Sequence, residues 1–109
     1  MVRDKGLETL ISEDLDGQAG LTEKAMFGGW AWLLDGKLLI GARDSGMLAR
    51  VGEENEPWTL KISGVIPMMM RDKRMRGWVR ASIDACSDDA LRRKLISAAI
   101  KFVSTLPEK

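Results

Sequence analysis

The side chains that most often carry protein chemistry are scarce in this sequence. Its 109 residues contain no histidine and a single cysteine, Cys86. Without histidine the chain can form neither a Ser-His-Asp nor a Cys-His arrangement, and it cannot form a zinc site of the Cys/His type. Cys86 precedes the last predicted helix, where a thiol pKa can be lowered, but Asp84, Asp88 and Asp89 oppose a thiolate. We therefore expect a structural role for Cys86.

Other catalytic and ligand-binding patterns are missing as well. No pair of carboxylates follows a glycosidase spacing, and no acidic run follows a calcium loop. The glycines match neither the dinucleotide-binding pattern nor the P-loop pattern. We predict that the protein is not an enzyme and that it has no catalytic residues, no cofactor and no metal site.

Charge is distributed unevenly along the chain, although the formal net charge is only +1. Residues 1–60 contain six Lys/Arg and eleven Asp/Glu, a net charge of −5, whereas residues 61–109 contain eleven and five, a net charge of +6. Within the basic part of the chain, Trp78 lies between Arg76 and Arg80. An aromatic side chain flanked by arginines suits a protein hot spot or base stacking. A solvated strand face that resists aggregation is the alternative interpretation. The candidate partner-binding residues are Arg71, Lys73, Arg74, Arg76, Trp78 and Arg80.

Seven methionines are a second unusual feature of the composition. Three of them, Met68, Met69 and Met70, are consecutive, and alternate residues of a strand point to opposite faces. They cannot all point into one core, so at least one must contact solvent, a loop or a partner. Methionine is common both at adaptable partner surfaces and as a core filler, and both interpretations stay open.

Hydrophobic periodicity predicts one α+β domain over residues 1–109, with a helix at each end of the chain. Leu7, Ile11 and Leu15 follow helical spacing, and Asp4 can cap that helix. The last helix begins after Ser87 or Asp88 and carries an apolar stripe that ends near Pro107. Its water-facing side is expected to carry Arg92, Arg93, Lys94, Ser97, Lys101 and Ser104.

The middle of the chain predicts a central antiparallel sheet of about five strands. Strands are expected over residues 26–34, 37–41, 47–51, 65–70 and 75–83, with an irregular connection over 52–64 in which Pro57 can start a short helix. Asp35-Gly36 is the composition of a type I′ hairpin turn, and Gly28-Gly29 marks a bulge or a close backbone approach. Strand 26–34 is apolar on both faces, so we expect cover on both sides and a homodimer.

The chain contains Met26-Phe27-Gly28-Gly29, Asp35-Gly36-Lys37 and Met75-Arg76-Gly77-Trp78, in this order. Together with neighbouring segments they resemble the N-terminal domain of the TfoX/Sxy family of competence-gene regulators. The resemblance covers nearly the whole chain in order. Its most specific parts are Met26-Phe27-Gly28-Gly29 and Met75-Arg76-Gly77-Trp78. The segments that carry it are Glu23 to Gly29, Asp35-Gly36-Lys37, Gly46 to Gly52, Pro67-Met68, Met75 to Val79 and Ala98 to Pro107.

The resemblance implies an α+β domain with a central antiparallel sheet and terminal helices. Full-length relatives act as transcriptional co-activators with the cyclic-AMP receptor protein and carry a second, C-terminal domain, whereas 109 residues leave room for the first domain only. The resemblance supplies no catalytic residues. It implies backbone constraints at Gly28, Gly29 and Gly77, and core positions for Met26, Phe27 and Trp78.

Three function classes follow from these observations. The first is a non-enzymatic, competence-related interaction module that acts through a protein partner, such as a transcription factor or an RNA polymerase-associated regulator. The alternatives are direct nucleic-acid binding, which a net charge near zero disfavours, and a small-molecule site between sheet and helix. The single cysteine, the charged N-terminus and the lack of a long apolar segment favour a cytoplasmic protein without membrane contact.

Overall fold

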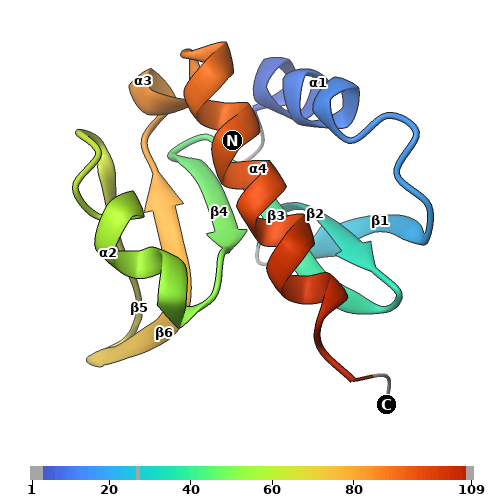
Figure 1. Ribbon diagram of the computed structural model, residues 1–109. Helices are drawn as coiled ribbons and strands as arrows, with labels where there is room; N and C mark the ends of the chain where they lie inside the picture. The colour runs from blue at the N-terminus through green and yellow to red at the C-terminus, as the bar shows by residue number, and fades with distance from the viewer. Residues whose placement is uncertain (1–3, 27, 108–109) are drawn as a thin grey trace.

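The computed structural model describes residues 4–26 and 28–107 (Figure 1). One sheet of six strands is combined with two longer helices and short helical segments. The elements in chain order are α1 (Lys5–Asp14), β1 (Leu21–Met26), β2 (Gly29–Leu34), β3 (Lys37–Arg43), β4 (Gly46–Arg50), the 3₁₀ turn η1 (Glu53–Asn55), α2 (Glu56–Thr59), β5 (Val65–Met70), β6 (Lys73–Ala81), α3 (Ile83–Cys86) and α4 (Asp89–Ser104).

The strands lie in the order β1-β2-β3-β4-β6-β5, and every neighbouring pair is antiparallel. The predicted α+β class with terminal helices is therefore confirmed. The strand count is six because β1, over Leu21–Met26, was not predicted, and the predicted strand 26–34 begins at Gly29. Met26 pairs with Gly29, and Gly28 adopts a φ of 75° in the turn between β1 and β2. Positive φ is easy for glycine and costly for other residues. Phe27 lies outside the described residues.

Glycines also allow the predicted close backbone approach in this sheet. A Cβ atom at Gly29 would overlap the carbonyl oxygen of Ala42 on β3, so only glycine fits at this position. The hairpin between β2 and β3 has positive φ at both Asp35 and Gly36, as a type I′ turn requires. The sequence prediction of this hairpin is confirmed.

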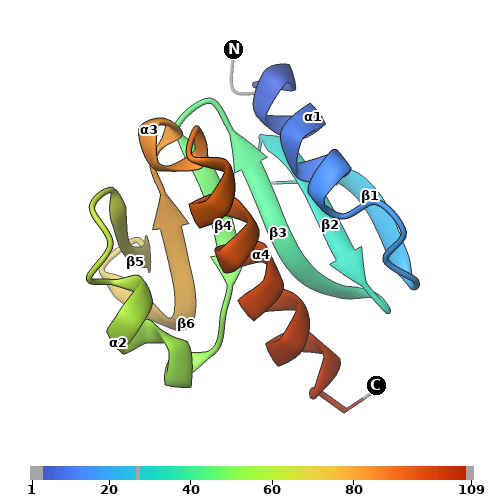
Figure 2. The same ribbon diagram turned by 45° about the horizontal axis from the view of Figure 1, so that its top comes forward.

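Helices α1 and α4 cover one face of the sheet, and Figure 2 shows α4 crossing the central strands with α1 beside it. The core lies in this layer because the helices place their apolar stripes against the alternating apolar residues of the strands. Asp4 and Asp88 cap the two helices, accepting hydrogen bonds from Leu7 N (3.0 Å) and Leu91 N (3.1 Å). The core includes Leu7, Ile11, Leu15, Trp32, Leu34, Leu39, Ile40, Met47, Ala49, Val51, Val79, Leu95, Ile96, Ala99 and Val103.

Arg92 corrects the prediction for the water-facing side of α4. Its side chain is only 1% exposed, and its Nε donates a hydrogen bond to Asp14 Oδ2 at 2.6 Å. Its Nη1 also donates to Asp89 Oδ1 at 2.9 Å. The hydrogen bond to Asp14 raises the pKa of Arg92. Arg92 is buried because the end of α1 brings a carboxylate against α4, and this contact joins the two helices.

Cys86 lies in the short helix α3, which Ser82 caps by accepting a hydrogen bond from Ala85 N at 3.1 Å. The thiol is 2% exposed, and burial raises its pKa from 9.0 to about 11. A buried, protonated thiol is a poor nucleophile, which agrees with the structural role expected for it. The predicted strand 75–83 ends at Ala81, because Ser82 begins α3.

A candidate binding hollow on the open face of the sheet

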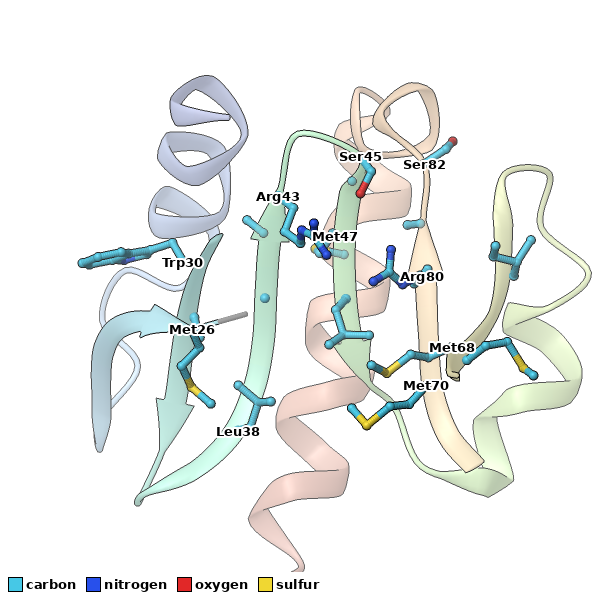
Figure 3. Close-up of a pocket in the computed structure, with 18 of the residues that line it drawn as sticks. Met26, Trp30, Leu38, Arg43, Ser45, Met47, Met68, Met70, Arg80 and Ser82 are labelled. Atoms are coloured by element: carbon cyan, nitrogen blue, oxygen red, sulfur yellow. The ribbon is translucent and has the colours of Figure 1, made fainter. Parts of the chain in front are cut away.

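The face of the sheet opposite α1 and α4 carries a hollow of about 610 Å³ (Figure 3). Strands β3 and β4 form its floor, and the β5–β6 hairpin forms one wall. Helices therefore cover one face of the sheet, while the hollow opens on the other. The residues that line the hollow include Met26, Leu38, Arg43, Ser45, Leu48, Ile66, Met68, Met69, Met70, Arg71 and Arg80.

Apolar side chains are unusually exposed around this hollow. Over residues 4–26 and 28–107 the exposed large apolar side chains are Ile66 (58%), Met69 (50%), Met70 (45%) and Ile83 (37%). The first three belong to β5 and line the hollow, and β5 is the last strand of the sheet. Met68 is only 9% exposed, whereas Met69 and Met70 are about half exposed. The prediction that the three methionines cannot all be buried is therefore confirmed.

Three arginines line the hollow and no carboxylate does. Figure 3 shows Arg43 from β3 and Arg80 from β6 pointing toward one another above β4. The Nε atom of Arg43 is buried and has no hydrogen-bond partner. Trp32 Nε1, in the core, is the other buried side-chain nitrogen of the described chain without a partner, so this feature is not particular to the hollow.

The other arginines of the described chain all have partners. Arg50 lies over the rings of Trp78, at 5.2 Å, and Phe102, at 5.8 Å. The rest form ion pairs: Arg74 with Glu56, Arg76 with Glu53, Arg92 with Asp14 and Asp89, and Arg93 with Asp14. Within residues 4–26 and 28–107, Arg43, Arg71 and Arg80 are the arginines without such a partner, and all three line the hollow.

The predicted partner-binding residues have different surroundings in the structure, and two of them form ion pairs. Arg74 turns to Glu56 at 3.1 Å, and the same carboxylate accepts a hydrogen bond from the Gly77 N–H at 2.6 Å. Arg76 lies 3.9 Å from Glu53 in the adjoining 3₁₀ turn.

The remaining candidates lie nearer the hollow or in solvent. Arg71 and Arg80 line the hollow, whereas Lys73 is exposed at the start of β6. Trp78 is half-buried beneath Arg50. The six residues therefore have different surroundings: two line the hollow, two form ion pairs, one is exposed and one lies beneath Arg50.

Sequence reasoning did not single out Arg43, and it considered a small-molecule site at another place in the fold. The prediction put a pocket between sheet and helix, but that space is filled by the core, and the hollow lies on the opposite face. One sequence signal was available: Arg43 ends a strand, residues 37–43, whose other members from Leu38 to Ala42 are uncharged. The sequence alone does not show what surrounds a charge at the end of an apolar strand, because that depends on which strands lie beside it in the fold.

Over the described ranges, no three His, Cys, Asp or Glu side chains are grouped so that they could hold a metal ion. No helix in that part of the chain is long and apolar enough to cross a membrane. The main features of the hollow on the open face are its apolar side chains and its arginines.

An antiparallel sheet with helices on one face and a basic, apolar hollow on the other defines a domain of the α+β class. The model of the TfoX N-terminal domain matches residues 13–103, and the chain therefore belongs to this family. The family is regulatory in type and is not a known enzyme family. Neither the search of curated proteins nor the search of solved structures found a match.

Proposed function

We propose that this domain is a non-enzymatic regulatory module that binds a protein partner through its β5–β6 hairpin. The observation that carries the proposal is the exposure of Ile66, Met69 and Met70 on the last strand of the sheet. Edge strands usually carry charges or cover that prevent association, and large exposed apolar side chains there favour an interface. Family membership supports a competence-related role, with a transcription factor or an RNA polymerase-associated regulator as the class of partner.

Charge complementarity indicates the chemistry of this partner. Arg71 and Lys73 flank the exposed methionines at the turn between β5 and β6, and neither forms an ion pair within the described chain. A partner surface with an acidic rim and an apolar centre would pair these charges and cover Met69 and Met70. Nucleic acid is less favoured, because the net charge is only +1 and Arg74 already pairs with Glu56 at 3.1 Å.

The test is capture of the partner by variants of the hairpin. Met69→Glu combined with Met70→Glu places two acids on the proposed surface, and we expect the partner bound by the wild-type domain to be lost. Ile83→Glu is the matched control, because Ile83 is the fourth exposed large apolar residue and lies in α3, away from the hairpin. Equal urea midpoints for all variants exclude unfolding as the cause.

Two results would contradict the proposal. One is retention of the partner by the hairpin variant, and the other is equal loss with Ile83→Glu. Light scattering of the purified domain separates binding to another protein from self-association, since a dimer broken by the hairpin variant would identify a second copy as the occupant of this surface.

A further inference from the structure

We propose that the hollow binds a small anionic amphiphile, a carboxylate that carries an unbranched apolar chain. The carboxylate would lie between Arg43 and Arg80, and the chain would lie against the methionines of β5. This inference goes beyond the proposed function, because it assigns a small-molecule ligand to the open face of the sheet.

The two ends of the hollow differ in polarity. In Figure 3 Arg43, Ser45 and Arg80 gather toward one end, while Met26, Leu38, Met68 and Met70 lie toward the other. A ligand that matches both ends needs a charged head and an apolar body. A purely polar anion would leave the methionine end uncovered, and a purely apolar molecule would leave the arginines without acceptors.

The charge of the head group follows from the arginines. Arg43, Arg71 and Arg80 line the hollow without any carboxylate among its described lining residues, and none of the three forms an ion pair within the described chain. A guanidinium presents its donors in a planar fork that matches a carboxylate, and hydrogen bonds between charged groups are stronger than neutral ones. A ligand carboxylate has two oxygens, so it can accept from Arg43 and Arg80 at once.

The apolar end fits a flexible chain. Met69 and Met70 are about half exposed, at 50% and 45%, and methionine side chains adapt to irregular partners because they are unbranched and polarisable. A chain bound along β5 would remove this apolar surface from water, which is favourable.

The size of the hollow favours a small molecule. Its volume of about 610 Å³ falls inside the range of roughly 300–1,000 Å³ that is typical of small-molecule sites. Such sites are largely apolar with a few convergent polar groups, and the hollow has that composition.

Four residues, Ile66, Met69, Met70 and Arg71, belong both to the wall of the hollow and to the proposed partner-binding hairpin. If the proposed function holds, the ligand would alter the surface that the partner meets. The ligand itself is tested without any partner protein, so a failure of one proposal is distinguishable from a failure of the other.

The experiment is a titration of the domain with decanoate, kept below the concentration at which it forms micelles, followed by NMR of isotope-labelled methionine methyl groups. We expect saturable shifts of Met26, Met68 and Met70, which line the hollow. Met75 is the internal control, because it lies on β6 and does not line the hollow. Absence of saturable shifts, or equal shifts at Met75, would overturn the proposal.

Ligand analogues and variants separate the head group from the chain. Decanamide has the same chain without the charge, and acetate has the charge without the chain, so both should bind at least about tenfold more weakly than decanoate. Arg80→Gln and Arg43→Gln should each weaken decanoate by a similar factor. Arg76→Gln is the matched control, since Arg76 also lies on β6 but pairs with Glu53 outside the hollow.

The proposal is wrong if decanamide binds as tightly as decanoate, or if Arg76→Gln weakens binding as much as Arg80→Gln does. The urea midpoint of each variant is measured alongside. Should Arg43→Gln fail to fold, the comparison of Arg80→Gln with Arg76→Gln still decides the outcome.

Discussion

The two faces of the sheet use arginine in opposite ways. On the helix-covered face, Arg92 is buried and donates hydrogen bonds to Asp14 and Asp89, so its charge joins α1 to α4. On the open face, Arg43 and Arg80 point toward one another over apolar surface, and no carboxylate lines their hollow. The contrast teaches that the acceptors around an arginine decide its role: Arg92, with its acceptors in place, serves the fold, whereas Arg43 and Arg80 form no ion pair within the described chain.

Removing Arg92 should have the largest effect on stability. Arg92→Met leaves the buried Asp14 carboxylate without its main partner, so the free energy of unfolding should fall by about 3–5 kcal/mol. Urea denaturation measures the change. Lys101→Met, on the exposed side of the same helix, is the control and should stay within about 0.5 kcal/mol of the wild type. A loss below about 1 kcal/mol for Arg92→Met would show that this buried ion pair does not hold the helices together.

Thiol labelling should distinguish the two faces next. Burial raises the pKa of Cys86 to about 11, two units above 9.0, which lowers its thiolate fraction about a hundredfold at a pH below 9. A cysteine placed at the rim of the hollow, Ser45→Cys in a Cys86→Ala background, should therefore react with a disulfide reagent at least about a hundredfold faster. Labelling rates of equal size would contradict the protected position of Cys86.

Alkaline pH should weaken the covered face through the same thiol. Because the folded pKa of Cys86 is raised from 9.0 to about 11, the unfolded chain loses this proton first. The contribution of Cys86 to stability is therefore complete below pH 9 and is lost as the pH rises toward 11. Urea midpoints should fall more steeply over this interval in the wild type than in Cys86→Ala, and parallel slopes would contradict the assignment.

The smallest change in the free energy of unfolding is expected for Arg43→Met, and it should be an increase. Arg43→Met removes a buried Nε atom that has no acceptor and replaces it with an apolar chain, so the free energy of unfolding should rise by about 1 kcal/mol. The same substitution type at Arg92 is destabilising, so the pair measures the contrast between the faces directly. A loss of stability with Arg43→Met would mean that Arg43 serves the fold.

Local signals allowed much of the fold to be predicted from the sequence. The caps Asp4 and Asp88, the Asp35-Gly36 turn and the strand over 65–70 all depend on residues close together in the chain. Strand β1 was missed because it is largely exposed, so its residues show no alternation of apolar and polar types. Its pairing with β2 defines it as a strand.

The site was harder to predict because its parts come from distant segments. Arg43 and Arg80 belong to β3 and β6, which lie on either side of β4. Nothing in the sequence of one strand indicates that the other lies near it. The burial of Arg92 likewise depends on Asp14, 78 residues away. The basic run around Trp78 was correctly seen as charged, but Glu53 and Glu56 neutralise two of its members once the chain folds.

The most direct test of the account is to follow the Nε resonances of the arginines by NMR while decanoate is added. The account predicts that the Arg43 and Arg80 signals shift and saturate together, while that of Arg92, already bound to Asp14, stays in place. Unmoved Arg43 and Arg80 signals, or a shift of equal size at Arg92, would contradict the claim that the open face holds its arginines ready for an anion.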